Sequence, residues 1–147
     1  NPHDEPSFLR VVNVPPRGVG KATIDRAVEA ATREGISAAA AFDRPELLEG
    51  IPPEALEKVR KFREALAGIA ATASREGVPA AIRALILAVN YPAELERCYP
   101  DALARQARAA AVEEVLNVSE NYARRAASPS LEGFLEDVAL SAEDARD

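Results

Sequence analysis

The sequence of 147 residues contains little of what most enzymes and metalloproteins need at their active sites. It has one cysteine, one histidine, no methionine, no tryptophan and only 5% aromatic residues. Cys98 cannot form an internal disulfide, which favours a reducing compartment. One cysteine and one histidine cannot supply a zinc site, and a Ser/His/Asp triad would depend on His3 near the N-terminus. The sequence therefore predicts no metal site and no catalytic residue.

Long hydrophobic runs are also missing. No uninterrupted apolar stretch is long enough to cross a bilayer. Residues 1–8 lack the basic start and the apolar centre of a signal peptide. We expect a soluble, cytoplasmic protein without a membrane partner.

Apolar residues at helical spacing dominate what is present. Over residues 21–34, Ile24, Ala27, Val28 and Ala31 recur at i, i+3, i+4 and i+7, the pattern of an amphipathic helix. Similar patterns predict further helices over residues 5–14, 37–42, 53–75, 78–90, 102–127 and 130–140, with a short element between 91 and 101. No alternating pattern indicates a strand. The sequence predicts an all-α domain of about six or seven helices, with the apolar helix 78–90 central to its core.

Helix caps and buried faces can be predicted in the same way. Ser37, Asp101 and Ser130 precede predicted helices and are suited to cap them. The residues expected to face the core from the last two helices are Val112, Val115, Leu116, Tyr122, Leu131, Phe134, Leu135 and Val138.

Charge is unevenly distributed along the chain. Residues 132–147 carry six acids and one base, a net charge of −5, which leaves −1 of the total −6 on residues 1–131. Between residues 10 and 26, Arg10, Arg17, Lys21 and Arg26 face only one acid, Asp25. A local positive patch is therefore expected on a nearly neutral body.

The stretch PPRGVGKAT, residues 15–23, lies in that patch and resembles a nucleotide-binding loop only superficially. Such a loop has glycine, four residues and then Gly-Lys-Ser/Thr, and it follows a buried strand. Here Pro15 stands where the first glycine belongs, Ala22 replaces the hydroxyl residue, and a helix precedes the turn. The sequence argues against ATP binding at this position.

The same stretch fits a helix-hairpin-helix turn. Gly18 and Gly20 can adopt positive φ, and the N–H groups of Val19, Gly20 and Lys21 would cluster at the start of the next helix. A helix N-terminus attracts anionic oxygens, and Arg17 and Lys21 would add charge beside it. This arrangement suits contact with the DNA backbone without base reading. A plain interhelical corner would explain the same residues.

Two stretches near the ends of the chain carry a resemblance to a known family. The residues of the near stretch are Asn1-Pro2, Asp4, Ser7–Arg10, Asn13–Pro15, Arg17–Gly20 and Thr23, and the far stretch is Ser130–Leu140. Both stretches resemble the 2B subdomain of UvrD/PcrA/Rep-type superfamily 1 DNA helicases, in which the far stretch is similar to the closing helix. Arg108–Val115 departs from that family's Arg-x-Glu-Asn-Leu-x-Glu-Leu pattern.

This resemblance implies an accessory part of an ATP-dependent 3′–5′ helicase. Residues 1–140 would form the 2B-like subdomain, and residues 141–147 an acidic tail leading back to the motor domain. ATP and Mg²⁺ would bind the parent motor subdomains of a bacterial protein, so this chain alone would need no cofactor and would not be an enzyme. The expected partners are duplex DNA or a single-strand/duplex junction, the motor subdomains and regulatory proteins. The residues expected to contact the DNA backbone are Arg17, Gly18, Val19, Gly20, Lys21 and Thr23.

Two further interpretations stay open. The chain could be a helical protein-interaction or autoregulatory module without direct DNA contact; an independent enzyme is less favoured. The basic run KVRKFR, Lys58–Arg63, could form a second DNA-facing patch, but charge runs on helices favour a solvated face.

Overall fold

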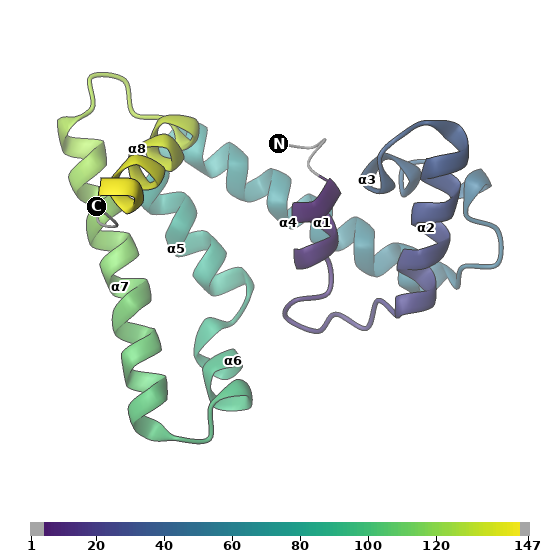
Figure 1. Cartoon of the computed structure of the whole chain (residues 1–147), viewed down its shortest axis with the longest axis horizontal. Coiled ribbons are helices and arrows are strands. Elements are labelled where there is room, and N and C mark those ends of the chain that lie inside the picture. The colour runs from purple at the N-terminus through teal and green to yellow at the C-terminus, as the bar shows by residue number, and fades with distance from the viewer. Residues whose placement is uncertain (1–4, 145–147) are drawn as a thin grey trace. The chain divides into compact units, whose positions relative to one another are not determined.

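The computed structural model describes residues 5–144. Within that range the chain forms eight α-helices and one short 3₁₀ helix, without any strand (Figure 1). The predicted all-α class is confirmed. The number of helices exceeds the predicted six or seven because the short element after residue 90 is itself a helix. Asn1, Pro2, His3 and Asp4, on which part of the sequence interpretation rests, lie outside the described residues.

The chain divides into two compact units, residues 1–65 and residues 66–147. The long helix α4 (Pro53–Glu76) begins in the first unit and ends in the second. The other elements of the first unit are α1 (Glu5–Val11), α2 (Lys21–Glu34), α3 (Ala38–Ala41) and the 3₁₀ helix η1 (Pro45–Leu47). The second unit contains α5 (Val78–Ala88), α6 (Tyr91–Cys98), α7 (Ala102–Arg125) and α8 (Leu131–Asp144). Helix α8 thus continues past Leu140, where the polar tail was expected to begin.

All three predicted N-terminal caps are confirmed. The Ser37 side chain accepts a hydrogen bond from the Ala40 N–H at 3.1 Å, and the Ser130 side chain accepts one from the Gly133 N–H at 3.0 Å. Asp101 accepts from the N–H of Ala104 at 2.7 Å. Each side chain satisfies one of the N–H groups that lack a partner in the first helical turn.

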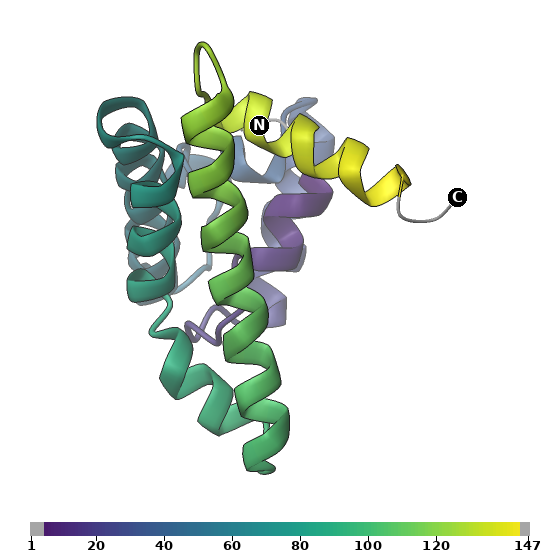
Figure 2. The same ribbon diagram turned by 90° about the vertical axis from the view of Figure 1, so that its left-hand side faces the viewer.

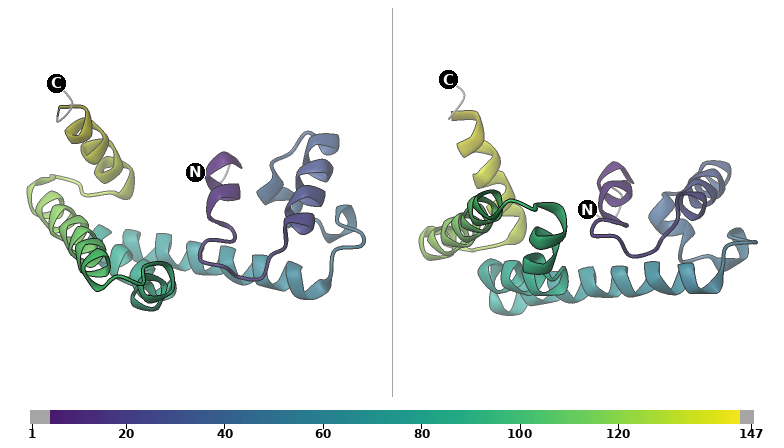
Figure 3. Two further views of the ribbon diagram at one scale, coloured as in Figure 1. Left: turned by 60° about the horizontal axis from the view of Figure 1, so that its bottom comes forward. Right: turned by 90° about the horizontal axis from the view of Figure 1, so that it is seen from below.

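Two neighbouring clusters form the core of the first unit. Small side chains let α2 and α3 approach closely, and Figure 3 shows these helices side by side. The first cluster consists of Ala27, Ala30, Ala31, Ala38, Ala41, Leu48, Ile51 and Ala55. The second consists of Val12, Val19, Val59 and Phe62, with Phe8, Ile24 and Phe42 packed against it. This second cluster joins α1, the loop before α2, and α4.

The core of the second unit centres on Tyr122. Its ring lies 5.6 Å from the ring of Phe134, between centroids, and Val78 completes the buried cluster. The Tyr122 hydroxyl accepts a hydrogen bond from the N–H of Ser130 at 3.3 Å. Helices α5 and α7 run alongside each other, and α8 crosses near the C-terminal end of α7 (Figure 2).

Several apolar residues predicted to be inside this unit are exposed. Helix α5 buries only Val78 and Ala81, and Leu87 is 79% exposed, so the prediction that this helix is central to the core is wrong for its second half. Val115, Val138 and Leu135 are exposed as well, the last at 59%. Helical periodicity identifies an apolar face, but it does not show how far along that face a neighbouring helix extends.

Among the described residues, no single helix is long and apolar enough to cross a membrane. Helices α5 and α6 reach the necessary length and composition only as a pair, and that pair is bent by 51° at the break between them.

Gly133 provides a test of the packing of α8. A Cβ at this position would collide with the hydroxyl of Tyr122, which is buried and already bonded to the N–H of Ser130. We expect Gly133→Ala to lower the free energy of unfolding by about 1–3 kcal/mol, the usual cost of overpacking. Urea denaturation followed by circular dichroism measures this change.

Gly68→Ala is the matched control, because Gly68 lies inside α4 and a Cβ there meets nothing within 4 Å. This substitution should raise the free energy of unfolding by about 0.4–1 kcal/mol, because alanine lowers the conformational entropy of the unfolded chain. Equal effects of the two substitutions would contradict this account of α8 packing.

Candidate nucleic-acid interface

The loop between α1 and α2 is held from within by Asn13. Its side-chain oxygen accepts hydrogen bonds from the N–H groups of Arg17, at 2.7 Å, and Val19, at 3.3 Å. The side chain of Val19 is buried beside Val59 and Phe62 of α4. The Val14–Pro15 peptide bond within the loop is cis. The turn at residues 18–20 is therefore fixed onto α4 rather than projecting freely from the surface (Figure 3).

Arg17 has a structural role that the sequence did not indicate. Its guanidinium donates hydrogen bonds to the carbonyls of Val11 at 2.9 Å, Val12 at 3.3 Å and Pro15 at 3.1 Å. It also lies 4.3 Å from the centroid of the Phe62 ring, a cation–π distance. The carbonyls at the end of a short helix lack internal partners, and a positive charge there is favourable. Arg17 thus closes α1 and fastens the loop, while its predicted contact with the DNA backbone stays a prediction.

The two glycines of the turn differ in conformation. Gly18 has φ +73°, as expected, and a Cβ there would lie 3.0 Å from Nζ of Lys58. Gly20, which could also adopt positive φ, has φ −66° and the extended conformation of a helix N-cap. A Cβ at Gly20 would meet nothing within 4 Å. The fold therefore requires glycine at position 18 but leaves room for a side chain at position 20.

The start of α2 presents uncapped N–H groups. Gly20 occupies the N-cap position and has no side chain to cap the helix. The N–H groups of Gly20, Lys21 and Ala22 donate to no other group among residues 5–144. The expectation that the N–H of Val19 would be available is wrong, because Asn13 accepts it. Three adjacent donors at the positive end of a 14-residue helix form a position suited to an anionic oxygen.

Lys21 and Thr23, both predicted to contact DNA, differ in exposure. The Lys21 side chain is 87% exposed and pairs with Asp25 at 2.6 Å. Ion pairs so exposed contribute little to stability, so the ammonium can exchange Asp25 for another anion. Thr23 is buried, with only 7% of its surface exposed, so little of its side chain is accessible to a ligand. Its predicted hydroxyl contact stays a prediction.

The basic run at residues 58–63 is largely paired with acids. Arg60 binds Glu57 and Glu64, and Lys61 lies 3.7 Å from Glu57. Arg63 binds Asp43, and its hydrogen bonds hold the pKa of that carboxyl below the ordinary value of 3.8. These pairs agree with the favoured interpretation of a solvated helix face. Lys58 differs from the others because its ammonium lies against Gly18 of the turn.

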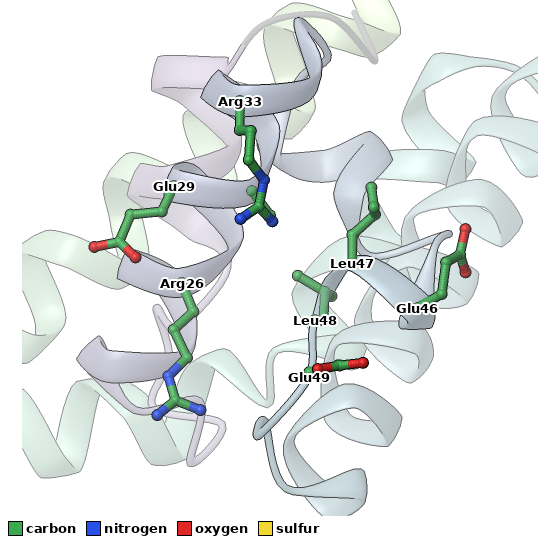
Figure 4. Close-up of a pocket in the computed structure, with 8 residues that line it drawn as sticks. Arg26, Glu29, Arg33, Glu46, Leu47, Leu48 and Glu49 are labelled. Carbon is green, nitrogen blue, oxygen red and sulfur yellow. The ribbon is translucent and has the colours of Figure 1, made fainter.

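A separate pocket of about 310 Å³ lies between α2 and the segment at residues 46–49. Figure 4 shows Arg26, Glu29 and Arg33 of α2 on one side and Glu46 and Glu49 on the other. Because three glutamates and only two arginines line it, the pocket shows no preference for an anion. Within the described part of the chain, no group of three or more His, Cys, Asp or Glu side chains could hold a metal ion.

Comparison with known proteins shows which proteins this all-helical chain with its hairpin turn is similar to. No protein-family model matches the chain. It is 26% identical to the ATP-dependent DNA helicase PcrA of Bacillus subtilis (strain 168) over 143 residues, 97% of this chain and 19% of that helicase. It is 36% identical to the ATP-dependent DNA helicase Rep of Escherichia coli (strain K12) over 109 residues, 74% of this chain and 16% of that helicase. The Rep protein of Salmonella typhimurium is 35% identical over the same length.

The chain is therefore distantly homologous to PcrA and Rep helicases over most of its length. It spans less than a fifth of the length of these relatives, 19% of PcrA and 16% of Rep.

The structural role of Arg17 can be separated from any role in binding. Arg17→Ala removes three hydrogen bonds and the contact with Phe62, and Asn13→Ala leaves two N–H groups without their acceptor. We expect each to lower the free energy of unfolding by about 1–3 kcal/mol. Lys21→Ala, at an exposed position in the same region, should change it by no more than about 0.5 kcal/mol. Urea denaturation of the three variants measures these values, and an Arg17→Ala protein as stable as Lys21→Ala would refute the structural role.

Proposed function

We propose that this chain is a 2B-like helicase subdomain that grips duplex DNA through the phosphate backbone at the start of α2. The observation that carries the proposal is the row of uncapped N–H groups from Gly20 to Ala22 beside the exposed Lys21. The homology to PcrA and Rep, both DNA helicases, supports DNA as the ligand.

The contact proposed here is made mainly by the backbone. A phosphate oxygen would accept hydrogen bonds from the open N–H groups at the helix start, where the helix dipole favours negative charge. The absence of a side chain at Gly20 lets the phosphate approach closely. Lys21 would exchange its pairing with Asp25 for the phosphate. Such contacts position the duplex without reading its sequence, and binding should weaken as salt rises.

In a complete helicase, this region would hold the duplex ahead of the junction and regulate unwinding. ATP and Mg²⁺ would bind the motor subdomains, and the present chain would contribute no catalytic residue. The assignment of residues 1–140 to this subdomain, and of 141–147 to a connection with the motor, is part of the proposal.

A second candidate is a helical protein-interaction or autoregulatory module. Large apolar side chains exposed on the second unit favour it, among them Leu87, Leu103 and Leu140. Such side chains are common at protein-binding surfaces when they lie together. Failure of the chain to bind duplex DNA at low salt would favour this second candidate over the first.

Gly20→Asp tests the DNA proposal without weakening the fold. Aspartate is a better N-cap than glycine by a few tenths of a kcal/mol, so thermal stability should stay the same or rise. Its carboxylate would occupy the N–H groups and repel phosphate, and we expect duplex affinity to fall by about tenfold or more. Fluorescence anisotropy with a labelled random-sequence duplex measures the affinity at several salt concentrations.

Gly20→Ser is the matched control, because serine caps the helix without adding a charge and should weaken binding less than aspartate does. The wild-type chain should show a negative slope of log affinity against log salt concentration. The proposal fails if the wild type does not bind at low salt, or if Gly20→Asp binds as well as the wild type.

A further inference from the structure

A lysine of helix α4, Lys58, lies next to the hairpin although it is distant from the hairpin in sequence. The end of the Lys58 side chain lies against Gly18: a Cβ at Gly18 would be 3.0 Å from Nζ and 3.6 Å from Cε. Gly18, at φ +73°, has no side chain to displace this lysine. The Lys58 side chain is 36% exposed, so its stem is covered while its ammonium can still reach solvent.

The position of Lys58 relative to the turn is fixed by its neighbour in sequence. Val59 is fully buried in the same cluster as Val19, so α4 and the turn are joined directly beside Lys58. The packing of the core thus holds the backbone of Lys58 beside the hairpin, and the ammonium lies next to Gly18.

Lys58 is paired with an acid one turn away on its own helix. Its Nζ lies 2.7 Å from the carboxylate of Glu54, which is 80% exposed. The hydrogen bond from Lys58 lowers the pKa of Glu54 below its ordinary 4.5, because it stabilises the charged carboxylate. Lys21 and Asp25 form a pair with the same i, i+4 spacing on α2, but in the reverse order, with the lysine first. Exposed pairs of this kind are weak enough for a phosphate to replace the acid.

We propose that Lys58 is a second lysine that contacts DNA phosphate at the hairpin, and that Glu54 limits this contact by competing for the ammonium. This inference rests on the proposed DNA-binding function and extends it to a residue outside the hairpin sequence. Two lysines from two helices would then flank the turn, and each would be restrained by its own acid.

The test compares Lys58 with Lys61 on the same helix. Lys61 is 70% exposed and also lies near a glutamate, Glu57, whereas the side-chain atoms nearest to Gly18 all belong to Lys58. Lys58→Gln removes the charge and keeps most of the covered stem. We expect it to weaken duplex binding about three- to tenfold and to reduce the salt slope by about 1, whereas Lys61→Gln should change affinity less than about twofold. Lys58→Arg, which keeps the charge, should bind nearly as well as the wild type.

Glu54→Gln tests the restraining role. It should raise duplex affinity about twofold to fivefold, because the ammonium no longer has a competing carboxylate. Glu57→Gln adds the same unit of charge on the same helix away from the turn, and it should have a smaller effect. Anisotropy titrations of the 147-residue chain with the labelled duplex measure all five variants, and circular dichroism verifies their folding.

The outcomes separate this inference from the proposed function. If the wild type binds and Gly20→Asp does not, but Lys58→Gln binds like Lys61→Gln, the role of Lys58 is refuted and the hairpin site stands. If Glu54→Gln gains no more than Glu57→Gln, the restraining role is refuted. If the wild type does not bind duplex DNA at all, the proposed function and this inference are both refuted.

Discussion

The conformation of the loop between α1 and α2 depends on hydrogen bonds made by two side chains within it, Asn13 and Arg17. Asn13 accepts two of the loop's N–H groups, and Arg17 binds three of its carbonyls while it lies over Phe62. Because Asn13 accepts the N–H of Val19, this residue can be buried without leaving that donor unsatisfied. Among residues 5–144, the N–H groups of Gly20, Lys21 and Ala22 at the start of α2 have no acceptor, and their direction is set by the helix itself.

A binding position built this way pays little ordering cost when a ligand arrives, because its donors belong to a helix that is already formed. The lysine side chains beside these donors, in contrast, can change their ion-pair partners. Lys21 and Lys58 both belong to exposed pairs with acids on their own helices, which contribute little to the fold and can be exchanged. A rigid backbone site with exchangeable charges suits a ligand that offers the same phosphate group at every position, as DNA does.

Much of this structure could be predicted from the sequence, since helices and their caps are set by local patterns. The apolar spacing in residues 21–34 and the caps at Ser37, Asp101 and Ser130 depend on residues a few positions apart. The exposure of Leu135 and Leu87 could not be predicted, because a helical pattern does not show where the neighbouring helix ends.

The candidate site was predictable in outline, and the parts that were not depend on tertiary packing. The sequence indicated a hairpin with glycines and positive charge, but it could not show in which direction each basic side chain points. Arg17 points inward because the carbonyls at the end of α1 and the ring of Phe62 lie beside it. Lys58 lies next to the turn, and its neighbour Val59 is buried in the same cluster as Val19, which is distant in sequence. The strongest signal for Lys58 was the basic run at 58–63, in which it could not be told from its neighbours.

The most direct test of the central claim is a titration of the ¹⁵N-labelled chain with duplex DNA, followed by the backbone amide signals in NMR spectra. Our account predicts that the signals of Gly20, Lys21 and Ala22 shift most, in proportion to the DNA bound, and that the shifts diminish as salt is raised. It would be contradicted if those three signals stayed in place while the largest shifts fell on amides of α5, α7 or α8.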